Sequence, residues 1–236
     1  MKILKNMLLV MIFTGLTASQ TQASEPRLGV ADFSNTSGAY WWSGGVGRDL
    51  ASMVTNELAN NGSFNLVERD KLYTVLDEQD LSASGRISKS TRSKIGELTG
   101  AQYLVLGTVT AYEENTEGTG GGFTISGVRI GGKNNKAYMA LDLRVVDTNT
   151  GEIAYNRTVE ARTGGFGFKL GLSRGNFSGD LGKYKKTPAG KAIRAAVVEI
   201  VDYLECAMVV QGSCLEDFDA KEKKRKKSLK SLINLD

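Results

Sequence analysis

The sequence predicts an α/β (α+β) domain that carries two inserted β-hairpins. Three observations support this prediction. Some segments have apolar residues at every second position, as strands do. They alternate along the chain with segments in which apolar residues recur every three to four positions, as in amphipathic helices. Two glycine-rich stretches, at about residues 113–136 and 163–182, interrupt this order beside predicted strands. Each stretch has a turn signal near its middle, which is typical of a hairpin.

Residues 1–23 have the pattern of a secretory signal peptide. Lys2 and Lys5 precede a short apolar run, Met7 to Leu16, and Thr21-Gln22-Ala23 fits cleavage before Ser24. No cysteine lies near that site, so we expect no lipid anchor on the mature N-terminus. No other segment is apolar for long enough to form a transmembrane helix. Any part that enters a membrane must therefore consist of β-strands.

The first half of the mature chain contains strands and amphipathic helices in alternation. The first helix has the clearest apolar stripe and ends at Asn60-Asn61-Gly62; the stripe consists of Val46, Leu50, Met53, Val54 and Leu58. A second helix carries Leu72, Val75 and Leu76, and a polar linker covers residues 82–90. Strands are expected at 27–33, 64–67 and 103–111, and a third, short helix at 91–98.

The second half continues the core and ends in a basic tail. Strands at 137–147 and 153–161 flank a turn at 148–151, and a long helix covers 189–210. The tail, residues 211–236, has six basic residues and one acid between Lys221 and Lys227. It is interpreted as a solvated segment. Nucleic-acid binding is not expected, because the signal peptide removes the chain from the cytoplasm.

The two cysteines, Cys206 and Cys214, are close in the sequence. In an exported chain two neighbouring cysteines favour one local disulfide. The alternative is a pair of free thiols, one of them buried in the long helix.

The residues of common catalytic sites are missing. The chain has no histidine, which excludes Ser-His-Asp and Cys-His catalysis and most zinc sites. Gly171-Leu172-Ser173-Arg174-Gly175 fits the nucleophile-elbow pattern by chance only. We expect no enzyme activity, no metal and no cofactor.

Residues 165–172 alternate strictly between large apolar side chains and glycine or lysine. Phe166, Phe168, Leu170 and Leu172 share one face of such a strand, and Lys169 and Ser173 share the other. A strand packed on a core has this pattern, and so does a strand between lipid and a water-filled lumen. In the second case the apolar residues face lipid, and Lys169 and Ser173 face the lumen.

Several motifs resemble the CsgG family, the curli-type outer-membrane secretion channels. They are Val67-Glu68-Arg69-Asp70-Lys71-Leu72, Gly100-Ala101-Gln102-Tyr103-Leu104-Val105-Leu106-Gly107, and Leu143-Arg144-Val145-Val146-Asp147 followed by Thr150-Gly151-Glu152-Ile153. The resemblance covers about residues 27–210, so we take residues 24–210 as a CsgG-like domain. The motifs consist of core and turn residues, and they therefore argue the fold more firmly than the activity.

The resemblance implies a periplasmic domain that assembles into a ring. Each subunit gives two hairpins to one shared transmembrane β-barrel, and the loop after the first strand lines a narrow constriction. Trp42 falls where the family has a pore-lining aromatic residue. Two positions depart from the family. Trp41 stands where an asparagine is usual, and Ser37 stands where a tyrosine is usual. A small shift of the alignment would bring Tyr40 to the position of that tyrosine. For the two tryptophans, a core anchor or a subunit contact is the alternative.

Two functions remain open at this point. The first is a subunit of an outer-membrane secretion channel that passively exports an unfolded, curli- or amyloid-like polypeptide. Its expected partners are further copies of the chain in a homo-oligomeric ring, the secreted polypeptide and outer-membrane lipid. Whether a periplasmic adaptor also binds is left open. Four strands cannot close a barrel, so membranous hairpins would require the ring. The second is a soluble periplasmic accessory factor that binds cell-envelope or flagellar machinery.

Overall fold

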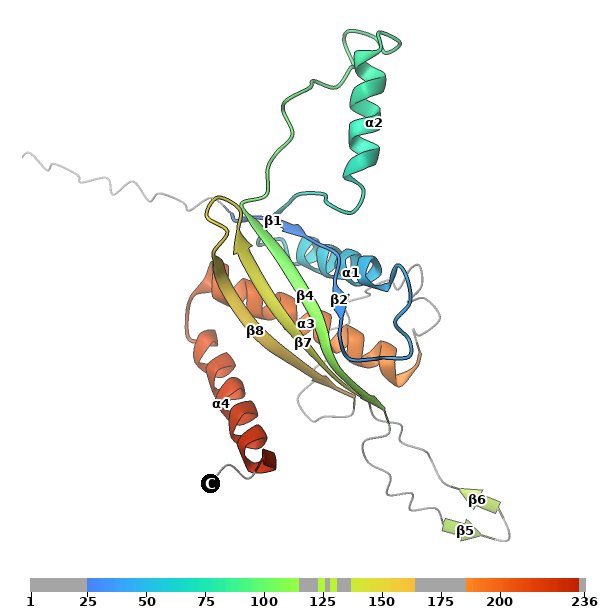
Figure 1. Cartoon of the computed structure of the whole chain (residues 1–236), viewed down its shortest axis with the longest axis vertical. Coiled ribbons are helices and arrows are strands. Elements are labelled where there is room, and N and C mark those ends of the chain that lie inside the picture. Colours follow the sequence, from blue (N-terminus) through green and yellow to red (C-terminus); the bar gives the residue numbers. More distant parts are fainter. Residues whose placement is uncertain (1–24, 115–122, 126–127, 131–136, 164–185, 234–236) are drawn as a thin grey trace, which may run out of the picture.

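The computed structural model describes residues 25–114, 123–125, 128–130, 137–163 and 186–233 (Figure 1). The predicted signal peptide lies outside these ranges, as do large parts of both insertions. Within the described residues the fold is a mixed α/β structure with one main open sheet and four α-helices, which confirms the predicted mixed class.

The main sheet has the strand order β3-β1-β4-β7-β8, with β2 paired to β4. Its strands are β1 (Arg27–Val30), β2 (Ser34–Asn35), β3 (Asn65–Leu66), β4 (Tyr103–Glu114), β7 (Ala137–Asp147) and β8 (Ile153–Arg162). β1 runs parallel to β3 and β4, whereas β4, β7 and β8 form an antiparallel meander. Because of this meander, the ends of β4 and β8 and the start of β7 meet at one end of the sheet.

Two helices, α1 (Val46–Asn61) and α3 (Pro188–Glu205), cover one face of the sheet (Figure 1). The predicted stripe of α1 is buried, and the helix ends at Gly62 in a left-handed conformation, as expected. Thr187 caps α3, because its side chain accepts a hydrogen bond from the Gly190 amide. Ile193, Ile200 and Leu204 are fully buried against the strands. Each such side chain stabilises the fold by about 1.5–3 kcal/mol.

Phe33 connects the first strand to both layers. Its amide donates to the Gly47 carbonyl at 3.1 Å, and its ring lies on Gly107 of β4. A β-carbon at Gly107 would lie 2.1 Å from Cε1 of Phe33, and one at Gly47 would lie 2.1 Å from the Phe33 carbonyl oxygen. Both positions therefore require glycine, and the close contacts fix where the chain leaves β1 for the next loop.

A second, two-stranded sheet lies in the first insertion. β5 (Phe123–Ile125) pairs antiparallel with β6 (Val128–Ile130), with Phe123 opposite Ile130. The turn signal of this stretch, at residues 131–135, lies outside the described residues.

The segment from residue 72 to residue 100 stands apart from the sheet (Figure 1). It begins with α2 (Leu72–Ala83), in which only Ser82 is buried; the Ser93 amide donates to the Ser82 hydroxyl at 3.1 Å. The helix expected at 91–98 was wrong, because these residues form turns and irregular structure and are all exposed. A single short segment without a buried face cannot offset the cost of helix nucleation.

The C-terminal region is helical where a solvated tail was expected. α3 continues into a π-helical turn, η2 (Cys206–Val210), and α4 (Cys214–Ile233) follows. A disulfide joins Cys206 to Cys214, and Phe218 of α4 is buried. The first half of α4 is therefore part of the folded domain.

A candidate pore-facing loop at the base of the insertions

The loop between β1 and α1 is the part of the site that the sequence predicted. Ser34 and Asn35 pair with Thr108 and Val109 of β4, and the hydroxyls of Ser34 and Thr108 are 2.7 Å apart. Asn35 then turns the chain, because its side-chain oxygen accepts hydrogen bonds from the amide and the hydroxyl of Ser37. Ser37 is half-buried and shapes the loop from within.

Trp41 belongs to the core of the subunit. It is fully buried, and its ring meets that of Tyr112 edge to face, with centroids 5.4 Å apart and planes at 82°. Its indole Nε1 has no hydrogen-bond partner among the described residues. A ring that is fully buried in one subunit fits the alternative of a core anchor, and it can hold its neighbours in place. The constriction assignment of Trp41 stays a prediction.

Tyr40 and Trp42 point in other directions than Trp41. Tyr40 is 65% exposed, and its hydroxyl donates to Glu114 Oε2 at 2.8 Å. Its ring also lies edge-on to Tyr112, with centroids 6.0 Å apart. Trp42 is half-buried and packs at 5.8 Å against Trp41. Tyr40 and Trp42 are thus the two aromatic residues of the loop that present surface.

Tyr112 is the residue that joins this cluster to the sheet. It lies near the end of β4, opposite Met139 of β7. Burial raises the pKa of its hydroxyl, and the neighbouring Glu114 carboxylate raises it further. The phenol therefore stays neutral, and the cluster is a neutral aromatic group beside one carboxylate.

A second group of side chains lies across the end of the sheet, and the sequence analysis missed it. In register, Glu113 of β4 lies opposite Tyr138 of β7, which lies opposite Arg162 of β8. The Tyr138 hydroxyl donates to Glu160 at 3.0 Å, and the Arg162 guanidinium lies 5.0 Å from the Tyr138 ring centroid. Burial, with help from Glu160, raises the pKa of Tyr138 to about 12. The only signal in the sequence was their position next to the glycine-rich insertions.

These contacts place the aromatic loop at the base of the insertions. β4 ends at Glu114, β7 begins at Ala137 and β8 ends at Arg162, so both insertions leave the sheet at this end. The hydrogen bond from Tyr40 to Glu114 ties the loop to the last residue before the first insertion. The apolar residues Phe166, Phe168, Leu170 and Leu172, and the polar Lys169 and Ser173, lie outside the described residues.

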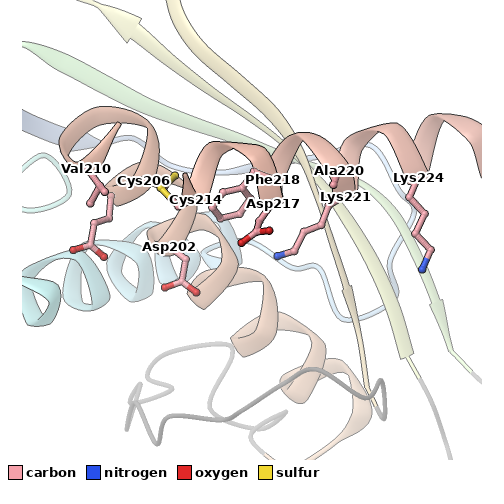
Figure 2. A pocket seen from close by; sticks show the side chains of 10 residues that line it. Asp202, Cys206, Val210, Cys214, Asp217, Phe218, Ala220, Lys221 and Lys224 are labelled. Atoms are coloured by element: carbon pink, nitrogen blue, oxygen red, sulfur yellow. A yellow bond between two sulfur atoms is a disulfide. The ribbon is translucent and has the colours of Figure 1, made fainter. Parts of the chain in front are cut away.

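A cavity of about 670 Å³ lies between α3, η2 and α4 (Figure 2). The Cys206–Cys214 disulfide lies at its wall, with an S–S distance of 2.03 Å. Its lining includes three carboxylates and two ammonium groups, from Asp202, Glu205, Asp217, Lys221 and Lys224. Partial burial and the nearby carboxylates of Glu199 and Glu205 raise the pKa of Asp202.

None of the helices within the described ranges is both long enough and apolar enough to cross a membrane.

The model of a family described as "Curli production assembly/transport component CsgG" matches residues 12–233 of this chain. The chain therefore belongs to the CsgG family, a family of transport components. The CsgG proteins of Salmonella typhimurium (strain LT2) and Escherichia coli (strain K12) are each 28% identical over 112 residues. That alignment covers 46% of this chain and 40% of each relative, so it spans less than half of the curated relatives.

Comparison with solved structures gives distant similarities. The hypothetical protein CT253 from Chlamydia trachomatis aligns with a TM-score of 0.43 at 13% identity, over 78% of this chain and 97% of that one. The PelC dodecamer from Paraburkholderia phytofirmans gives 0.32 at 12% identity, over 58% and 70%. The LpoB C-terminal domain from Escherichia coli gives 0.31 at 15% identity, over 58% and 82%.

Proposed function

We propose that this chain is exported and forms a subunit of an outer-membrane secretion channel, with its α/β domain in the periplasm. It would pass an unfolded, curli- or amyloid-like polypeptide through an oligomeric pore. Membership of the CsgG family supports a transport role. The observation that supports the channel is the hydrogen bond from Tyr40 to Glu114, because it holds an exposed aromatic loop residue where the chain leaves the sheet for the first insertion.

In this proposal the two insertions form the membrane part. They are hairpins whose apolar residues Phe166, Phe168, Leu170 and Leu172 face lipid, with Lys169 and Ser173 toward a water-filled lumen. The meander supports this arrangement, since it sends both insertions out of one end of the sheet. Hairpins from several subunits would close one shared barrel, because an open edge leaves unpaired backbone groups in lipid.

The loop would line the narrowest part of the pore. Tyr40 and Trp42 offer aromatic surface, and Ser37 and Trp41 hold the loop in shape from behind. Aromatic rings are rigid and contact most side chains without a requirement for sequence, so an extended polypeptide can slide past them. Transport through such an opening would be passive and would need no cofactor. A partner outside the membrane, or assembly of the exported chain there, would give it direction.

Assembly into a ring would also give α2 a partner. One side of α2 is apolar and carries Leu72, Val75 and Leu76. Val75 and Leu76 are nevertheless exposed, and the neighbouring Tyr73 is 63% exposed. A helix of this length is marginal in water unless an apolar face packs on something. A neighbouring subunit would supply that surface, since α2 stands apart from its own sheet (Figure 1).

The test is extraction of the mature protein from outer membranes in detergent, followed by electron microscopy. We expect rings with a central pore. Leu76→Asp should break the rings into single subunits, whereas Thr74→Asp, on the opposite side of α2, should leave them intact. A monodisperse monomer that fractionates with soluble periplasmic proteins would overturn the channel and support the alternative, an accessory factor that binds cell-envelope or flagellar machinery.

A further inference from the structure

The first half of α4 is fastened to the domain by several independent contacts. The disulfide holds its first residue, Cys214, and the buried ring of Phe218 meets Tyr203 edge to face at 5.4 Å. The Arg157 guanidinium donates to the Phe218 carbonyl. Lys221 forms an ion pair with Glu199 at 2.7 Å. These contacts fix the direction in which the rest of the helix projects.

The second half of α4 has one side toward the sheet and one side away from it. Glu222 and Arg225 form a bidentate pair at 2.7 and 2.8 Å, and both are largely covered. Glu222 raises the pKa of Arg225, and Glu160 and Asp142 of the sheet contribute to the rise. Arg225 is therefore near Glu160, two residues before the end of β8.

The outward side of this half consists of lysines. Lys223, Lys226, Lys227 and Lys230 follow helical spacing and lie away from Phe218 and Arg225. All four are exposed. Of these, Lys226 also contacts Glu222, at 3.4 Å. Leu229, 43% exposed, follows Arg225 by one helical turn and therefore lies on the sheet side. We call these four residues the lysine face.

The lysine face lies at the insertion end of the domain. α4 runs beside β8 in the same direction as that strand, and its last turns reach the level at which β4, β7 and β8 end (Figure 1). α2, with its acidic residues, is at the opposite end (Figure 1). If the insertions enter a membrane as proposed above, the lysine face lies close to that membrane's surface.

We infer that the lysine face of α4 docks on the anionic phospholipid headgroups of the membrane that the insertions enter. The inference rests on the proposed function for the identity of the membrane. A side with four cations matches a layer of phosphate groups, since the Glu222 carboxylate that Lys226 contacts is already paired with Arg225, and lysines near such a layer add to binding. The rigid attachment of α4 explains why this charge is held in one place.

The experiment is flotation of the full mature chain with preformed vesicles. One set contains phosphatidylcholine alone and the other contains 30% phosphatidylglycerol, on the order of the anionic content that recruits basic segments. We expect tighter binding to the anionic vesicles, weakened by salt. The triple variant Lys223→Gln, Lys227→Gln, Lys230→Gln should lose most of this preference, at about fivefold in affinity per lysine.

The matched control removes three lysines from the other end of the domain. The variant Lys71→Gln, Lys89→Gln, Lys94→Gln has the same net charge as the α4 variant and should keep the preference for anionic vesicles. Equal loss in both variants would mean that only net charge matters, and it would overturn the inference. Circular dichroism of both variants should be unchanged, which excludes unfolding as the cause.

The outcomes also separate this inference from the proposed function. Channels that conduct in both vesicle types, with no effect of the α4 variant on binding, would overturn the lysine face and leave the channel standing. Lysine-dependent binding to anionic vesicles without any conductance would remove the channel and keep the docking surface. An α4 variant that changes only the ring size in detergent would show that the face meets a second copy, and the inference would be wrong.

Discussion

The Tyr40 hydroxyl donates a hydrogen bond to the Glu114 carboxylate at 2.8 Å, across 74 residues of sequence. Tyr40 lies in the loop before α1, and Glu114 is the last residue of β4 before the first insertion. Because a charged acceptor strengthens a hydrogen bond, this contact ties the position of the loop to the root of the insertion. A change in the conformation of the loop is therefore expected to shift the start of the insertion, and the reverse.

The two neighbouring tryptophans should respond in opposite ways to truncation. Trp42→Ala removes a half-buried side chain of the proposed constriction and should raise single-channel conductance in planar bilayers, with a smaller effect on folding than Trp41→Ala. Trp41→Ala empties a fully buried site and should lower the free energy of unfolding by about 3–5 kcal/mol, measured by urea denaturation. An unchanged conductance in a folded Trp42→Ala channel would remove this residue from the pore.

Phe168 is expected to face lipid, and a charge there should block insertion. Phe168→Lys places a cation near the middle of the bilayer, at a cost of about 2–4 kcal/mol. Fractionation should find this variant outside the outer membrane. Lys169→Gln, one position away and proposed to face the lumen, should fractionate as the wild type does. Equal fractionation of Phe168→Lys and wild type would contradict the lipid-facing assignment.

The Cys206–Cys214 disulfide should stabilise the attachment of α4. It closes a loop of eight residues in sequence separation, so the double variant Cys206→Ser, Cys214→Ser should lose about 2–3 kcal/mol of unfolding free energy. Hydrogen exchange should increase in α4 before it increases in α1. Ser213→Ala, within the same loop, serves as the control. A double variant with wild-type stability would show that Phe218 and Arg157 suffice to hold the helix.

Asp202 should make the domain less stable as the pH rises. Partial burial and the carboxylates of Glu199 and Glu205 raise its pKa, although Lys221 opposes the shift. The folded state therefore binds this proton more tightly than the unfolded state, and stability is lost as the pH rises through the raised pKa. Asp202→Asn should be more stable than wild type at neutral pH, with the difference vanishing in acid. Urea denaturation of both proteins at several pH values measures this difference, and a gain of equal size at every pH would contradict the prediction.

The sequence predicted the sheet strands and the two packed helices well. The alternation in 137–147 and the stripe from Val46 to Leu58 are local patterns, and both elements bury the residues that the patterns select. It failed at residues 91–98, where a helical pattern has no surface to pack against. It also treated residues 214–233 as solvated, although it favoured the disulfide, because composition alone does not show that Phe218 is buried and holds the helix on the domain.

By itself the sequence determined the family, the mixed α/β class and the presence of two glycine-rich insertions. Periodicity and motifs are properties of neighbouring residues, so one chain suffices to read them. Only the tertiary structure decided which aromatic residue of the loop is buried and which is open. That choice depends on two residues of β4 that are more than 70 positions away. Tyr112 packs on the buried ring of Trp41, and Glu114 accepts a hydrogen bond from Tyr40. The direction of the lysine face likewise depends on contacts with Tyr203 and Arg157 that no local pattern contains.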